Sequence, residues 1–395
     1  MEKQICNIYI FLWCLYSLQG TLYPRGGFLS QGLLVVVLAM SLYYFIKVIT
    51  CYKMPLVLKS LSLLLLLWTI YGFIIIIYGN GVKWVANHTY LKNIYTSILP
   101  IYTFYYFSKN GFLTQSMLRR WGVVFLMIGI ICFNTHYSEN LSNAIARGSN
   151  REEFTNNTAY AILSILPLLP LYYKKPTIQY VLLFVCMLYV LWGMKRGAIL
   201  SGFVCSCWFL YMSLKEKGYN SGKKKAWRSI LIVIIVLGAI FAVQQMFLTS
   251  EYFGRRYDLT VEGDSSGRDS IFINYLNFYL GQSNYLYLLI GNGADATVRL
   301  LNEFAHNDWL EIAINNGLIM IIIYVIYWIN IIKTISVARK TNYTCYLIIS
   351  MFFIIFLMKS FYSMSYSDIT IYASSAFGFA LANYNTIEQK VIVSE

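Results

Sequence analysis

Several long, nearly continuous apolar runs constrain the fold of this chain more than any other feature of its sequence. Clear examples are Leu61–Ile70, Ile230–Phe241 and Leu318–Ile332. Of the 395 residues, 58% are hydrophobic and only 12% are charged, whereas about a quarter of the residues in a typical soluble domain are charged. Because the hydrocarbon core of a bilayer takes roughly 20 apolar residues per helix, these runs predict an integral membrane protein.

The apolar segments predict an all-α polytopic membrane protein with about twelve transmembrane helices. Helices are expected because lipid offers no hydrogen-bonding partners, so each spanning segment must satisfy its backbone groups internally. We expect the spans near residues 5–19, 28–50, 56–78, 91–107, 121–136, 157–173, 177–193, 196–214, 229–249, 311–332, 343–361 and 369–386.

The distribution of Lys and Arg predicts which side of the membrane each loop faces. With the N-terminus in the cytoplasm, the short cytoplasmic segments hold more than half of the 31 basic residues, as the positive-inside rule requires. The net charge of +14 follows from this topology and does not indicate nucleic-acid binding. We therefore expect spans one to nine in 1–249, one large periplasmic loop with short helices in 250–310, and the last three spans with a cytoplasmic tail in 311–395. The predicted location is the inner membrane of a bacterium.

Two basic residues, Lys195 and Arg196, stand at the expected outer start of the span at 196–214, against the general charge bias. A helix N-terminus favours anions because its free N–H groups and its positive dipole end point the same way. An arginine side chain also binds phosphate oxygens through two parallel hydrogen bonds. The pair therefore indicates an anion site; the alternative interpretation is a misplaced helix boundary.

The expected periplasmic loop carries its own cations. Arg268 precedes an apolar and aromatic stretch, Ser270–Leu280, which predicts a helix at the membrane surface. Arg255 lies a little earlier in the same loop. Acidic residues outnumber basic ones here, so these arginines do not belong to a general basic coat. Arg268 is a second candidate for binding an anion, or it pairs with a neighbouring carboxylate such as Asp269.

A third group of residues follows where the loop approaches the next span. Gly291 and Gly293 flank an asparagine, and His306 and Asn307 stand at the expected first turn of the tenth span. The chain has only three His. His306 is a candidate functional residue, because the other two, His88 and His136, lie in outer segments without such surroundings. Its alternative role is that of a helix cap or a packing residue.

Together, these sequence elements resemble the O-antigen ligase and O-antigen polymerase family. The resemblance rests on K-R-G-A at the start of a span, G-R before an amphipathic helix, G-N-G, and H-N-D-W-L-E-I-A-I-N-N-G running into a span. It covers residues from about 190 to 320. Relatives often carry an acidic residue just before the last glycine, where this chain has Asn315 and Asn316. We therefore assign no carboxylate role at that point.

The resemblance implies transfer of a glycan from undecaprenyl diphosphate to a sugar hydroxyl on the outer face of the inner membrane. The acceptor is lipid A-core for a ligase and a second lipid-linked repeat for a polymerase, and the sequence does not decide between them. We expect an inverting glycosyltransferase of surface polysaccharide assembly that needs neither a metal ion nor a cofactor. The implied catalytic residues are His306, Arg268 and Arg196, and the implied substrate-binding residues are Arg255, Lys195, Asn307, Gly291 and Gly293.

The main alternative from another class is a polytopic transporter or a flippase for lipid-linked glycans. Such proteins commonly consist of two related halves with polar sites near the middle of the membrane. Here the long loop follows the ninth span rather than the midpoint, and the centres of the expected spans contain almost no acids or bases. Charges within the membrane would be expected along a transport path.

Overall fold

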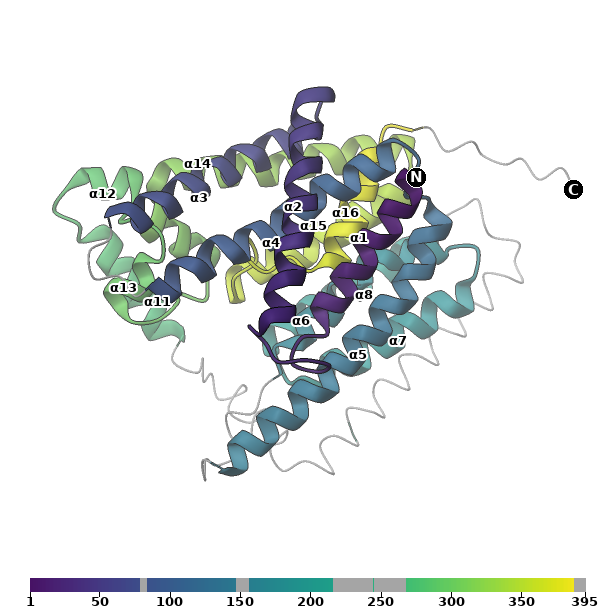
Figure 1. The fold of residues 1–395 in the computed structure, drawn as a ribbon, viewed down its shortest axis with the longest axis horizontal. Helices are drawn as coiled ribbons and strands as arrows, with labels where there is room; N and C mark the ends of the chain where they lie inside the picture. The colour runs from purple at the N-terminus through teal and green to yellow at the C-terminus, as the bar shows by residue number, and fades with distance from the viewer. Residues whose placement is uncertain (79–83, 147–155, 216–243, 245–267, 387–395) are drawn as a thin grey trace, which may run out of the picture.

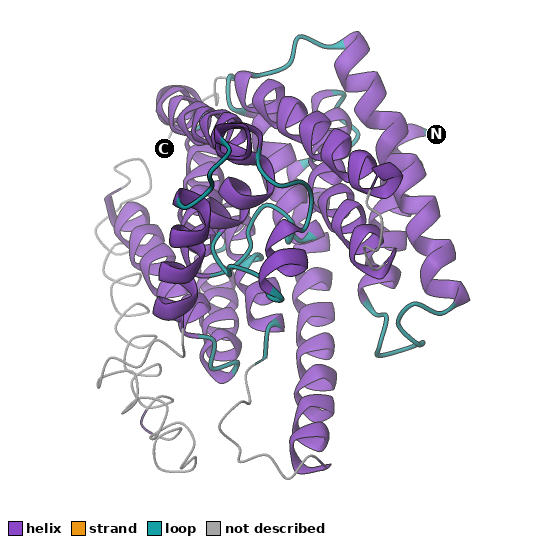
Figure 2. Cartoon of the chain, turned by 90° about the vertical axis from the view of Figure 1, so that its left-hand side faces the viewer, coloured by secondary structure: helices purple, strands orange, loops and turns teal. Residues whose placement is uncertain are grey.

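The computed structural model describes residues 1–78, 84–146, 156–215, 244 and 268–386, and this part of the chain forms helices joined by loops, without β-strands (Figures 1 and 2). The elements are α1 (Glu2–Ser17), α2 (Phe28–Cys51), α3 (Leu56–Tyr78), α4 (Trp84–Lys109), α5 (Gln115–Ala146), α6 (Thr158–Leu163), the 3₁₀ helix η2 (Leu166–Tyr172), α7 (Pro176–Trp192), α8 (Arg196–Lys215), α11 (Arg268–Leu280), α12 (Tyr285–Ile290), α13 (Ala296–Leu301), α14 (Asp308–Thr341), α15 (Tyr343–Tyr362) and α16 (Ile371–Asn383).

Six helices in the described residues are long and apolar enough to cross a membrane, judged by length and composition. They are Phe28–Cys51, Leu56–Ile75, Gln115–Glu139, Arg196–Lys215, Asp308–Thr341 and Tyr343–Tyr362. Each coincides with a span expected from the sequence, so the prediction of a helical membrane protein is confirmed. The expected spans at 5–19, 91–107, 177–193 and 369–386 are also helical, as α1, α4, α7 and α16. The expected span at 229–249 lies outside the described residues.

The segment expected to form one span at 157–173 is not a continuous α-helix, which corrects that prediction. It begins as α6, ends after Leu163 and resumes as the 3₁₀ helix η2. Pro167 and Pro170 lie in this second part. Because proline has no backbone N–H and its ring clashes with the preceding turn, the α-helical hydrogen bonds to the carbonyls of Leu163 and Leu166 cannot form.

The centre of the bundle is formed by α4, which packs against α16 and α2. Gly378 of α16 permits this contact, because a Cβ atom at that position would lie 2.6 Å from the carbonyl oxygen of Ile101 in α4. On the other side of α16, the rings of Phe377 and Phe352 stack with centroids 3.8 Å apart and link α16 to α15. The core is therefore closed by direct contact between helices distant in the sequence.

Two irregular regions interrupt the bundle. The short helices α11, α12 and α13 gather beside one end of α14 (Figure 1). The segment 363–370 joins α15 to α16 without helical structure. Irregular backbone among membrane helices is tolerated where it is buried in protein or lines a polar cavity, and both regions prove to border such cavities.

Candidate functional site

The helix α14 is broken at Gly317, close to its N-terminal end. Gly317 has φ 76° and ψ −176°, a conformation that is open essentially to glycine alone. The break frees the carbonyls of the preceding turn, and the chain before α13 supplies their partners. The N–H of Asn292 donates to Ile314 at 2.8 Å, and that of Gly293 donates to Asn315 at 2.9 Å. The break therefore binds the G-N-G segment.

Gly291 and Gly293 pack against this break, and neither lines the cavities described below. A Cβ atom at Gly291 would lie 2.4 Å from both the carbonyl oxygen of Asn315 and the nitrogen of Asn316. One at Gly293 would lie 2.7 Å from Cδ1 of Ile75. The geometry gives both glycines a close-packing role, and the substrate binding implied by the family resemblance stays a prediction.

Glu311 holds the chain before α14 in place. Its carboxylate is fully buried and accepts hydrogen bonds from the Thr297 hydroxyl at 2.5 Å, the Ala305 N–H at 2.9 Å and the Asn315 amide at 3.2 Å. These contacts join α13 and the start of the His306 segment to α14. Glu311, the last residue of the H-N-D-W-L-E motif, therefore positions the neighbouring chain.

Asp308 anchors the irregular segment 363–370. Its buried carboxylate accepts hydrogen bonds from the Tyr324 hydroxyl at 2.8 Å, from the Ser365 N–H at 2.8 Å, and from the Ser365 hydroxyl. A second contact comes from Ser97, whose hydroxyl oxygen accepts from the N–H of Ile369 at 3.1 Å. Hydrogen bonds thus fix the segment 363–370 to α14 and to α4.

An ion pair between a buried lysine and an exposed aspartate fixes the other side of the same segment. Lys359 in the last turn of α15 is only 1% exposed. Its ammonium forms an ion pair with the Asp368 carboxylate, donates to the Asp368 carbonyl at 3.0 Å, and lies 4.9 Å from the ring centroid of Tyr160. A lone lysine in an apolar span is the sequence signal for such a pair, and the sequence analysis did not use it.

Asn307 caps α14. Its side-chain oxygen accepts from the N–H groups of Trp309 and Leu310 at 3.0 and 3.1 Å, and its amide donates to the carbonyl of Phe361 at 3.3 Å. The cap is therefore Asn307, and His306 precedes it with a positive φ of 52°. His306 lies at the corner just before this cap, so the cap role considered for it belongs to Asn307.

The predicted cations meet at one cavity of about 370 Å³. Arg268 begins α11 and Arg196 begins α8, with Lys195 just before it. All three line the cavity together with His306 and Asn307. The Arg268 guanidinium donates to the carbonyl of Tyr362 at 3.0 Å, which fixes its position at the cavity wall. Five residues predicted from three separate parts of the sequence thus border the same space.

The surroundings of His306 favour the neutral imidazole. Partial burial lowers the pKa of His306 below its usual 6.5, and the positive charges of Arg268 and Lys195 lower it further. Glu303 acts in the opposite direction. Because each of the two cations disfavours a third positive charge nearby, the ring stays able to accept a proton at neutral pH.

A larger cavity of about 930 Å³ adjoins the first. Lys195, Arg268 and His306 line both cavities and form the wall between them. The larger one extends between α4, α5 and α6, and every residue of the segment 363–370 except Ser365 borders it. Asp295, which follows the G-N-G segment, also lines it.

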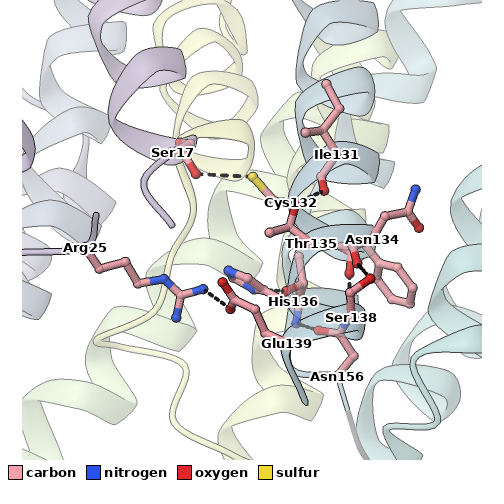
Figure 3. Close-up of polar contacts among 12 residues, drawn as sticks. Ser17, Arg25, Ile131, Cys132, Asn134, Thr135, His136, Ser138, Glu139 and Asn156 are labelled. Carbon is pink, nitrogen blue, oxygen red and sulfur yellow. Dashed lines mark hydrogen bonds and ion pairs between the residues drawn. The ribbon is translucent and has the colours of Figure 1, made fainter. Parts of the chain in front are cut away.

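His136 reaches the larger cavity from α5 and was not singled out in the sequence. Its Nδ1 lies 2.7 Å from the hydroxyl of Thr158. One turn further along α5, Glu139 forms an exposed ion pair with Arg25 at 3.2 Å (Figure 3). The sequence around His136 carries no motif, and its spatial neighbour Thr158 comes from another helix, so the sequence alone does not indicate this position.

One sequence-predicted substrate-binding residue, Arg255, lies outside the described residues. Within the described part of the chain, no group of three or more His, Cys, Asp or Glu side chains is placed to hold a metal ion.

Comparison with known proteins gives no match: no family model and no curated protein sequence matches this chain.

Proposed function

We propose that the protein transfers a glycan from undecaprenyl diphosphate to the hydroxyl of an acceptor sugar, in the assembly of a surface polysaccharide. The observation that carries the proposal is the convergence of Lys195, Arg196, Arg268 and His306 on one cavity. Cations that face a diphosphate leaving group and a neutral base for the acceptor hydroxyl are groups that such a transfer can use. The sequence resemblance to O-antigen ligases and polymerases, which rests on the same residues, points to the same reaction.

The reaction replaces one bond to the anomeric carbon of the donor sugar by another. The acceptor oxygen attacks this carbon from the side opposite the diphosphate, and the bond from carbon to the phosphate oxygen breaks with its electron pair leaving on the diphosphate. Attack from the opposite side inverts the anomeric centre. Because negative charge grows on the leaving group, fixed cations that face it lower the barrier.

In this mechanism, Arg196 and Arg268 bind the departing diphosphate and Lys195 adds a third positive charge. A guanidinium offers two parallel donors to phosphate oxygens, whereas an ammonium acts as a point charge. The bond from Arg268 to the Tyr362 carbonyl restrains the side chain before the substrate binds, so little rearrangement is needed during the reaction.

His306 accepts the proton of the acceptor hydroxyl as that oxygen attacks. The lowered pKa of His306 keeps the ring neutral, which is the form that a general base needs. We place the active site on the periplasmic side of the inner membrane, because the positive-inside rule predicts that side for the loop with Arg268 and His306. A good leaving group removes the need for a separate acid.

Substitution of the arginines by lysine tests the proposed diphosphate site. Purified protein is assayed for glycan transfer with EDTA present, with lipid A-core and a second lipid-linked repeat offered separately as acceptors. Arg196→Lys and Arg268→Lys are each expected to lower the rate by about 10²–10³. Arg25→Lys is the matched control, because Arg25 pairs with Glu139 and lines neither cavity. Normal transfer by both site variants contradicts the diphosphate site.

Replacement of His306 by alanine separates the base from the cations. His306→Ala is expected to lower transfer by roughly 10²–10⁴ while the lipid-linked donor still binds, whereas the arginine variants weaken donor binding as well. Full activity of His306→Ala, or an equal loss of donor binding in all three variants, excludes His306 as the base.

A further inference from the structure

The larger cavity contains two buried polar groups that lack ordinary partners. Asp295 is 6% exposed, and its carboxylate accepts no hydrogen bond from the described residues. Tyr90 is 5% exposed, and its hydroxyl lies beside the Asn316 amide without a hydrogen bond of normal geometry in the described chain. Both residues line the cavity. Because buried polar groups are normally satisfied, these two call for a partner that enters the cavity.

Asp295 is the N-cap residue of α13, but its side chain does not cap the helix. An aspartate at this position usually accepts a hydrogen bond from the first turn of the helix. The nearby guanidinium of Arg299 donates to the carbonyls of Ala294 and Asn292. The carboxylate is therefore left as an acceptor at the cavity wall.

The lining of the larger cavity suits an uncharged ligand with many hydroxyl groups. One face is formed by the amide and hydroxyl groups of Asn93, Thr96 and Ser97 on α4. Aromatic rings such as Trp13 and Tyr160 contribute apolar surface. Lys195 and Arg268 border this cavity at the wall that it shares with the smaller one, whereas the groups named here and the Asp295 carboxylate are neutral or negative and disfavour an anion in the rest of it. A volume of about 930 Å³ accommodates an oligosaccharide of a few residues.

We propose that the larger cavity binds the acceptor sugar, with Asp295 accepting from one of its hydroxyl groups and Tyr90 contributing a second hydrogen bond. This proposal rests on the proposed function and adds the location and chemical class of the acceptor. The two cavities share His306 and Arg268 as their common wall. A sugar held by Asp295 presents a hydroxyl to His306, while the donor diphosphate occupies the smaller cavity on the other side of that wall. Asp295 and Tyr90 are acceptor-binding residues, and His306 remains the base.

Sugar binding without any donor is the direct test. The purified protein in lipid nanodiscs is titrated at pH 8 with the methyl glycosides of glucose, galactose, mannose, rhamnose and N-acetylglucosamine, and binding is followed by saturation-transfer NMR. At least one glycoside is expected to bind. Asp295→Asn and Tyr90→Phe are expected to weaken that binding, by about tenfold to a hundredfold for the hydrogen bond to the charged group.

Two control variants separate loss of the ligand contact from loss of structure. Glu139→Gln changes a carboxylate that pairs with Arg25 outside the cavity. Tyr95→Phe removes a hydroxyl on the same helix as Tyr90, where it donates to Thr69 at 3.2 Å away from the cavity. Both are expected to bind the glycoside like the unmodified protein. Thermal melting identifies any variant that is misfolded, and an added glycoside should raise the melting temperature only where binding persists.

The outcomes distinguish this inference from the proposed function. Glycoside binding that depends on Asp295 and Tyr90, in a protein that transfers no glycan, supports the sugar cavity and overturns the glycosyltransferase. Transfer with an unchanged acceptor KM in both variants supports the glycosyltransferase and overturns the acceptor site. Loss of lipid-linked donor binding in Asp295→Asn assigns the cavity to the donor sugar and overturns the inference. Binding of none of the five glycosides also overturns it.

Discussion

The contact between Gly291 and the break in α14 leads to a prediction that separates packing from substrate binding. In Gly291→Ala, the new Cβ would lie 2.4 Å from the backbone of both Asn315 and Asn316, so the two segments must move apart. The backbone conformation of Gly291, with φ 75° and ψ −176°, costs a side-chain-bearing residue about 1–3 kcal/mol. Weakening the hydrogen bonds from Asn292 and Gly293 adds about 0.5–1.5 kcal/mol each. We expect a loss of roughly 4 kcal/mol in stability.

Gly26→Ala is the matched control. Gly26 shares the positive φ, at 71°, but a Cβ atom there would meet nothing within 4 Å, so only the backbone strain of about 1 kcal/mol remains. Thermal melting of both variants in detergent measures the difference. If Gly291→Ala melts like Gly26→Ala yet loses glycan transfer, the packing role is refuted and the substrate-binding role predicted from the sequence stands.

Three further predictions follow from the buried and partly buried ionisable groups. Glu311→Ala removes the acceptor of three hydrogen bonds, including that from Thr297, and is expected to destabilise the protein by roughly 3 kcal/mol or more in thermal melting; a change below about 1 kcal/mol would contradict its anchoring role. Arg268→Gln should raise the pKa of His306 toward its usual 6.5, because one of the positive charges that lower this pKa is lost. NMR can follow the titration, because the chain has only three His. An unchanged pKa would show that Arg268 does not act on the ring. Burial, with the negative charge of Glu311, raises the pKa of Asp295 from 3.8 to about 7, against the effect of Arg299. Between about pH 4 and 7 the folded protein keeps a proton on Asp295 that the unfolded chain releases, so this residue lowers the free energy of unfolding as the pH rises, by up to about 4 kcal/mol. Asp295→Asn should remove that pH dependence and melt at a higher temperature than the unmodified protein at pH 8. An identical pH profile of the melting temperature would refute the pKa shift.

The helices could be predicted from the sequence because the property that forms them is local. Apolar runs of membrane length gave the positions of α2, α3, α8 and α15 within a few residues, and Arg268 does begin α11. The two prolines that follow the break at 164–165 also indicated that the α-helix is interrupted, but the apolar composition of the segment favoured one continuous span. Length and hydropathy thus locate a helix, and they do not show where its hydrogen-bonding pattern changes.

The candidate site was predictable only in part. The residues that converge on the smaller cavity stood out one by one, by charge or by position at a helix start, and only the family resemblance grouped them, since no spacing in the sequence relates Lys195 to Arg268 or His306. The anchors were missed because their partners lie far along the chain: Asp308 binds Ser365, and Glu311 binds Thr297. The family resemblance implied that Gly291 and Gly293 bind substrate, and the structure adds that the small size of Gly291 lets the chain approach Asn315 closely.

In the segment 363–370, the residues that anchor the chain differ from some of those that line the larger cavity. Ser365, Asp368 and Ile369 fix it through Asp308, Lys359 and Ser97. Ser363 and Ser367 face the larger cavity and take no part in those anchoring contacts. Substitutions at these two positions can therefore alter the lining while the anchors keep the wall in place. Under the proposed function, a few changes in this short stretch would change which saccharide fits, with the helical frame left intact.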